Sequence, residues 1–266
     1  MHAHEVDYEI FGDDMQFVEV ELDPGESVIA EAGAFMYQRG DIKMETIFGD
    51  PNKADDSILG KMFSAGKRWV SGENLFVTAF TAGSRRAKSQ VAFAASYPGK
   101  IIPLNLAEYG TMHCQKNSFL CAAKGVKTDI ALSRKIGSGL FGGEGFILQK
   151  LDGDGMAFVH AGGTIREFNL TGGEILKIDT GCVVAFQAKM DFDIEINRDI
   201  KSGLFGGEGF VFATLKGPGR CFLQSIPFSR LADTIFNAAS LSKGGGGQHK
   251  GEGSILGGIA TSMFQD

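Results

Sequence analysis

The chain has 266 residues, of which 43% are hydrophobic, and carries a formal net charge of −6 at pH 7. This hydrophobic content excludes a disordered chain. The acidic balance disfavours binding to a nucleic-acid backbone, which normally needs a basic surface. The first residues lack the apolar run of a secretory signal, and no stretch approaches the roughly 18 apolar residues of a membrane helix. We therefore expect a cytoplasmic protein that is not secreted.

The most distinctive feature of the sequence is an internal repeat. The nonapeptide SGLFGGEGF stands at residues 138–146 and again at 202–210, and the flanking residues match at the same 64-residue step. A more diverged copy lies upstream, where SGENLFVTAF at 71–80 aligns with GGEGFILQKL at 142–151. The sequence predicts a single compact domain, residues 1–241, of three internal repeats at about 15–98, 99–162 and 163–241, followed by a glycine-rich tail at 242–266.

In chain order, the predicted elements are mainly short β-strands. Residues 18–22 (VEVEL) alternate apolar and acidic side chains, as a half-buried strand does, and a weaker helical pattern follows at 58–69. The basic stretch AGSRRAKSQ at 82–90 is expected to form a long hairpin loop. Strands are expected at 146–151, 191–196 and 210–215, and a helix is expected after Ser229, a residue type that caps helix N-termini. These elements predict an all-β fold with one or two short helices.

The glycines of the repeat have the spacing of a dinucleotide-binding loop at Gly137, Gly139 and Gly142. Such a loop follows a strand and opens a helix. Here the glycines lead into a strand pattern, and in the second copy Lys201 replaces the first glycine. We interpret both copies as structural turns and expect no cofactor.

A glutamate follows a glycine at the same place in all three copies. These repeated turn residues are Gly72, Glu73, Gly143, Glu144, Gly207 and Glu208. Three equivalent carboxylates could converge on a metal or a cationic ligand, but a carboxylate can also accept hydrogen bonds from the amides of its own turn. We expect the structural role, and we expect it also for Glu26 and Glu174, which recur in a second turn.

Catalytic and metal-binding signals are weak. His113 and His160 lack the H-x-H with a spaced glutamate by which a cupin-type barrel holds a metal, and no serine lies in a G-x-S-x-G elbow. The four cysteines have no C-x-x-C spacing, so we expect buried free thiols. The sequence therefore predicts no catalytic residues, no metal ligands and no enzyme.

Basic residues gather near the longer loop. Arg68, Arg85, Arg86 and Lys88 form a candidate patch for an anionic ligand, either a lipid head group or nucleic acid. The alternative is a solvated loop. The net charge of the chain opposes nucleic-acid binding.

Several motifs together resemble one protein family: the repeated GLFGGEGF, the SGENLF equivalent and the closing PFSRLADTI at 227–235. It is the family of the yeast protein called altered inheritance of mitochondria twenty-four, and the resemblance covers about residues 8–241. It implies a triplicated β unit similar to the tryptophan RNA-binding attenuation protein, itself a short relative of the double-stranded β-helix. It also implies a homotrimer whose nine units close a ring, because three like units in a row leave an open sheet edge at each end.

The function expected from these observations is a non-catalytic oligomeric β scaffold or binding module. It would associate with itself and with a protein partner or a membrane surface. The membrane is suggested by the resemblance, because the mitochondrial member of the family is linked to inner-membrane organisation. One alternative is a small-ligand- or metal-binding β-helix enzyme that uses His113 or His160. Another is RNA binding through Arg85 and Arg86, by fold analogy alone.

Overall fold

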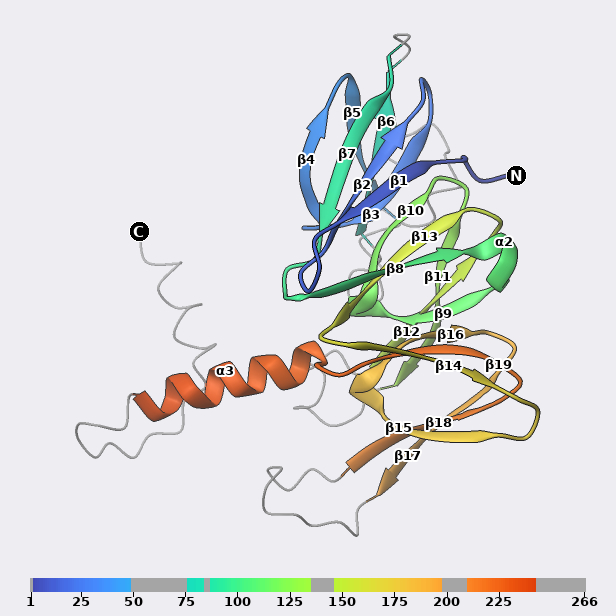
Figure 1. Ribbon diagram of the computed structural model, residues 1–266, viewed down its shortest axis with the longest axis vertical. Helices are drawn as coiled ribbons and strands as arrows, with labels where there is room; N and C mark the ends of the chain where they lie inside the picture. Colours follow the sequence, from blue (N-terminus) through green and yellow to red (C-terminus); the bar gives the residue numbers. More distant parts are fainter. Residues whose placement is uncertain (1, 49–75, 84–86, 135–145, 198–209, 243–266) are drawn as a thin grey trace. The chain divides into compact units, whose positions relative to one another are not determined.

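The computed structural model describes residues 2–48, 76–83, 87–134, 146–197 and 210–242. Residues 1–230 form one compact unit, and residues 231–266 are a separate one. Within the described part of the first unit, the strands β1 to β19 form four antiparallel sheets, and they are labelled in Figure 1. The predicted all-β fold with few helices is confirmed.

The strands have the following bounds. The first seven are β1 (Asp7–Phe11), β2 (Phe17–Leu22), β3 (Ser27–Glu31), β4 (Phe35–Arg39), β5 (Ile42–Phe48), β6 (Phe76–Ala82) and β7 (Ser89–Ala94). The next six are β8 (Gly99–Asn105), β9 (Met112–Gln115), β10 (Phe119–Ala123), β11 (Lys127–Arg134), β12 (Phe146–Asp152) and β13 (Met156–Gly162). The last six are β14 (Ile165–Leu170), β15 (Ile175–Asp179), β16 (Val183–Gln187), β17 (Asp191–Asn197), β18 (Phe210–Lys216) and β19 (Gly219–Gln224).

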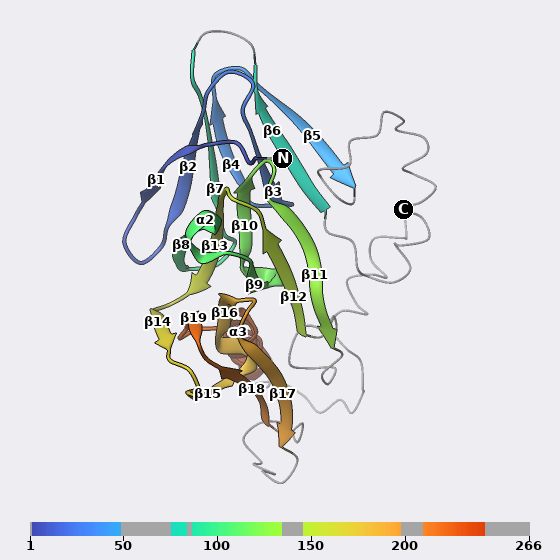
Figure 2. The same ribbon diagram turned by 90° about the vertical axis from the view of Figure 1, so that its right-hand side faces the viewer.

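The same pairings occur in each of these three groups of strands. In the second group, β13 lies between β8 and β10, while β12 lies between β9 and β11. In the third group, β19 lies between β14 and β16, while β18 lies between β15 and β17. In the first group, β7 lies between β2 and β4, while β6 lies between β3 and β5. Figure 2 shows the resulting ribbons β5–β6, β11–β12 and β17–β18.

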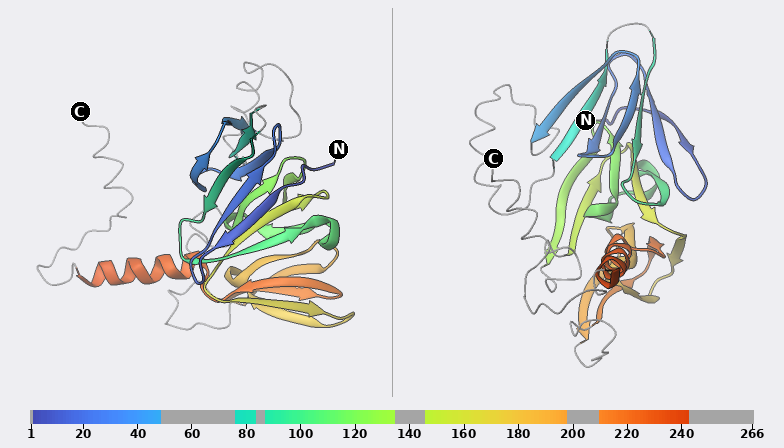
Figure 3. Two further views of the ribbon diagram at one scale, coloured as in Figure 1. Left: turned by 45° about the horizontal axis from the view of Figure 1, so that its top comes forward. Right: turned by 90° about the vertical axis from the view of Figure 1, so that its left-hand side faces the viewer.

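Neighbouring groups are joined by further antiparallel pairs. Strand β3 pairs with β10, and β9 pairs with β16. These pairs create two six-stranded sheets, in the orders β5-β6-β3-β10-β13-β8 and β11-β12-β9-β16-β19-β14. The other two sheets are smaller, β1-β2-β7-β4 and β15-β18-β17. In Figure 3 the blue, green and orange strands accordingly follow one another as they do in the sequence.

Alternating side chains explain why these segments form strands around a core. In β2, Val18, Val20 and Leu22 are buried while Glu19 and Glu21 lie on the other face. Strands that lie between two neighbours are buried more completely, as in β10, whose five residues are all buried. Among the described residues, the core contains three clusters of apolar side chains, centred on different groups of strands.

The described residues contain two α-helices. The short α2 (Leu106–Tyr109) begins after Asn105, whose side chain accepts a hydrogen bond from the amide of Ala107. The longer α3 (Phe228–Ser242) begins one residue before Ser229, so Ser229 lies in its first turn and not at the N-cap as predicted. Pro227 precedes α3, where a missing N–H costs no hydrogen bond. The helix predicted at 58–69 lies outside the described residues.

Candidate functional site

Most of the predicted site residues lie outside the part of the chain that the structure describes. These are the turn residues Gly72, Glu73, Gly143, Glu144, Gly207 and Glu208, together with Arg68, Arg85 and Arg86 of the basic patch. Their roles stay predictions. The structure does describe Lys88, the two histidines and the four cysteines.

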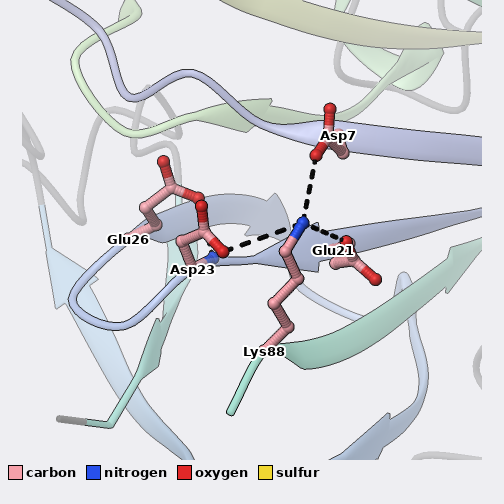
Figure 4. A network of polar contacts seen from close by, with 5 residues as sticks. All are labelled: Asp7, Glu21, Asp23, Glu26 and Lys88. Atoms are coloured by element: carbon pink, nitrogen blue, oxygen red, sulfur yellow. Dashed lines mark hydrogen bonds and ion pairs between the residues drawn. The ribbon is translucent and has the colours of Figure 1, made fainter. Parts of the chain in front are cut away.

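Lys88 lies among carboxylates, as Figure 4 shows. Its Nζ atom lies 2.6 Å from Glu21, 3.5 Å from Asp7 and 3.8 Å from Asp23. The hydrogen bond to Glu21 is the largest of the effects that raise the pKa of Lys88. Because three acids surround one ammonium group, the surface here attracts cations more than anions. This part of the candidate patch therefore has its positive charge already compensated.

The two recurring turns are held by their glutamates. A carboxylate oxygen of Glu26 accepts a hydrogen bond from the amide of Asp23 at 2.8 Å, and one of Glu174 accepts from the amide of Thr171 at 2.5 Å. The hydrogen bond from the Thr171 amide is the main cause of the lowered pKa of Glu174, and a second bond from the Thr171 hydroxyl adds to it. The predicted structural role of these two residues is confirmed.

His160, on β13, is buried with 2% of its surface exposed. Its ring meets that of Tyr97 edge to face at 4.5 Å, and neither ring nitrogen has a hydrogen-bond partner in the described structure. A Cβ atom at Gly99 would lie 2.6 Å from Nε2, so glycine is required there for the close approach. Burial lowers the pKa of His160 to about 4.

The corresponding position of the next group of strands, 64 residues later, holds Gln224. This side chain is also buried, but both of its polar atoms have hydrogen-bond partners. Its Oε1 accepts a hydrogen bond from the amide of Gly162, and its Nε2 donates to the carbonyl of Gly181, both at 2.8 Å. The comparison shows that β13 and β19 use the same position for different polar chemistry.

The remaining candidates do not converge. His113, on β9, contacts the ring of Phe186 on β16 edge to face, and burial is the main cause of its lowered pKa. Cys114, Cys121 and Cys221 are buried free thiols, and Cys182 is half-buried. Within the described residues, no three His, Cys, Asp or Glu side chains are grouped as metal ligands.

Strand β4 has a surface that sequence reasoning missed. Phe35 and Met36 expose 40% and 51% of their surfaces, although the residues at the corresponding positions of β10 and β16 are almost fully buried. Those residues are Phe119 and Leu120, each 3% exposed, and Val183 and Val184, each 0% exposed. The difference follows from the topology, since β10 and β16 lie between two strands whereas β4 ends its sheet.

Strand β15 has the complementary property. Ile175 exposes 66% of its surface, and Lys177 is also exposed. The corresponding strands β3 and β9 are covered by β10 and β16, with which they pair. Strand β15 ends the sheet β15-β18-β17. We call the outer sides of β4 (Phe35–Arg39) and β15 (Ile175–Asp179) the two open edges.

The strand pairings define an all-β protein built of antiparallel sheets. The chain belongs to the family described as Mitochondrial biogenesis AIM24, whose model matches residues 8–226. It is 31% identical over 226 residues to an uncharacterised protein of Streptococcus pyogenes serotype M6, covering 83% of this chain and 86% of the relative. The crystal structure of the protein SPYM3_0169 from Streptococcus pyogenes has the same fold, with a TM-score of 0.69 and 24% identity over 88% of this chain and 100% of that one.

None of the described helices is both long enough and apolar enough to span a membrane.

Proposed function

We propose that the protein is a non-catalytic, homo-oligomeric β scaffold or binding module. The observation that carries this proposal is the exposure of Phe35 and Met36, which occupy positions that are buried in β10 and β16. Burying an apolar side chain contributes roughly 1.5–3 kcal/mol, so these exposed residues favour a form in which another strand covers them. An exposed, apolar sheet edge otherwise promotes uncontrolled association.

A closed ring satisfies both open edges at once. The three groups of strands repeat one set of pairings, which supports three internal copies of one unit. A chain with one open edge at each end associates head to tail, and such contacts form a ring when the rotation closes. The family resemblance implies three chains in this ring.

The polar residues of the described structure support a structural role and not a catalytic one. Glu26 and Glu174 bind the amides of their own turns, and Lys88 binds neighbouring carboxylates. The family description names a cellular process and no reaction. We propose a cytoplasmic scaffold that binds a protein partner or a membrane surface, and co-sedimentation of the purified full chain with phosphatidylcholine vesicles, with and without anionic lipid, distinguishes the two.

Native mass spectrometry of the purified full chain tests the oligomer. We expect a species of three times the 28.4 kDa of one chain. Met36→Asp places a charge on the open edge of β4 and is expected to shift the protein to the monomer. Met15→Asp is the matched control, because Met15 is 71% exposed and lies outside β4. A wild-type protein that is monomeric at micromolar concentration would show that the proposal is wrong.

A further inference from the structure

Each of the two open edges belongs to a sheet that lacks strands present in the two larger sheets. The larger sheets have the orders β5-β6-β3-β10-β13-β8 and β11-β12-β9-β16-β19-β14. The sheet β15-β18-β17 corresponds to the first three strands of this order. The strands β4, β7 and β2 of the remaining sheet correspond to the last three.

The chain itself provides two examples of how these halves join. At the first junction, Ala30 lies opposite Cys121 and Ile29 opposite Ala122. At the second, Cys114 lies opposite Ala185 and His113 opposite Phe186. Both junctions are antiparallel.

The strands that meet at these junctions can be aligned residue by residue. Strands β4, β10 and β16 each contain a register shift after their first residue, at Phe35, Phe119 and Val183. This aligns Tyr37 with Cys121 and Ala185. Strands β3 and β15 are aligned by the turns that precede them, where Gly25 and Gly173 have φ angles of 89° and 88° and each is followed by the capping glutamate.

Strands β9 and β15 are aligned by the short helices that follow them. The helix η2 (Lys116–Ser118) follows β9, and η3 (Thr180–Cys182) follows β15 at the same spacing. Ala30 of β3, Cys114 of β9 and Ile178 of β15 therefore occupy one position. The register of a third junction follows from that of the first two.

We propose that β15 of one copy pairs antiparallel with β4 of a second copy, with Ile178 opposite Tyr37 of the partner subunit. Lys177 then lies opposite Gln38 of the partner subunit, and Leu176 opposite Arg39 of the partner subunit. This inference rests on the proposed function and names the surfaces that join the copies. The resulting sheet, β17-β18-β15-β4-β7-β2, repeats the order of the two larger sheets, with β1 added at its end.

The chemistry of the paired residues agrees with this register. Ile178 is 5% exposed and lies opposite the half-buried ring of Tyr37, so this pair joins two largely apolar side chains. Within its own sheet Tyr37 lies on the face of Glu19, to which its hydroxyl donates a hydrogen bond at 2.5 Å. Lys177 and Gln38 are both exposed, so this pair joins two polar side chains on the other face. No two like charges lie opposite each other, and Lys177 already binds Glu195 at 2.7 Å within its own copy.

A specific backbone hydrogen bond also follows. At the first junction the amide of Lys124 donates to the carbonyl of Ser27 at 3.0 Å, and at the second the amide of Ala188 donates to that of Thr111 at 2.9 Å. The corresponding donor on the open edge is the amide of Gly40. Its acceptor is the carbonyl of Ile175 of the partner subunit.

Cysteine cross-linking of the full chain tests the register. In a Cys182→Ser background, the double variant Lys177→Cys/Gln38→Cys places two thiols directly opposite each other, within the distance a disulfide requires. On mild oxidation it should give covalent dimers and trimers on a non-reducing gel. Gln38→Cys/Ile175→Cys is the matched control, because Ile175 lies two residues before Lys177 on the same face of the regular strand β15, and its thiol is shifted to a diagonal distance of about 7–8 Å, beyond disulfide reach.

The outcomes separate this inference from the proposed function. Cross-linking of the control pair, or of neither pair in a protein that native mass spectrometry shows to be oligomeric, would overturn the β4–β15 register and leave the oligomer intact. A monomeric protein would overturn both. Hydrogen exchange of the wild type gives a second measurement that needs no variant: the amide of Gly40 should be protected in the oligomer, and exchange there as fast as in an unpaired strand would contradict the pairing.

Discussion

Acidification should destabilise the fold through His160. The ring is neutral in the folded protein because burial lowers the pKa of His160 to about 4, whereas the unfolded value is about 6.5. Because the folded pKa lies below the unfolded one, the unfolded chain takes up the proton first as the pH falls. The contribution of neutral His160 to stability is therefore present above pH 6.5 and is lost as the pH falls towards 4. Proton uptake by the unfolded chain over this window lowers the free energy of unfolding by roughly 2 kcal/mol between pH 7 and pH 5.

Urea denaturation at pH 7 and pH 5, at one protein concentration, measures this loss. The carboxylates of the protein also titrate as the pH falls, so the informative quantity is the difference between wild type and His160→Gln, which cannot take up a proton and copies the residue at Gln224. The variant should lose about 2 kcal/mol less than wild type over this pH range. His113→Gln is the matched control and should change the pH dependence less, because His113 is only half-buried. Equal pH dependence in wild type and His160→Gln would refute the reasoning.

Three further predictions concern single side chains. Gly173→Ala should lower stability by about 1 kcal/mol, because φ is 88° there, while Gly172→Ala should have little effect; equal melting temperatures by calorimetry would show that the turn tolerates a side chain. Gln224→Leu should cost about 2–4 kcal/mol in urea denaturation, because a buried backbone donor and a buried acceptor lose their partner, and a loss no larger than that of the exposed Asn117→Leu would contradict this. Glu174→Gln should lower the melting temperature at pH 7 and have no effect below the lowered carboxylate pKa, since a depressed pKa stabilises only above it; a pH-independent difference would exclude the charge as the cause.

Local patterns in the sequence were enough to predict much of the fold. The alternation at 18–22 predicts β2 because the apolar side chains of Val18, Val20 and Leu22 must share one face of a strand. The recurrence of glycine followed by glutamate predicts the turns held by Glu26 and Glu174, since the hydrogen bonds involved are local.

Features that depend on distant contacts could not be predicted in this way. The acids around Lys88 come from strands and turns far from it in sequence, and so its compensated charge is invisible in the basic stretch at 82–90. The open edges are equally hidden, because Phe35 and Phe119 are the same residue type and differ only in what covers them. The four-residue α2 is too short to show helical periodicity.

The unlike open edges of one chain have a genetic consequence under the proposed assembly. A copy whose β4 is damaged still presents an intact β15, so it can join a growing assembly and leave the ring without a closing contact. When damaged and normal copies are produced together, each damaged copy would remove normal chains from complete rings. Co-expression of a β4-defective copy with the normal copy should therefore reduce the number of complete rings, whereas the absence of one copy would leave normal rings intact.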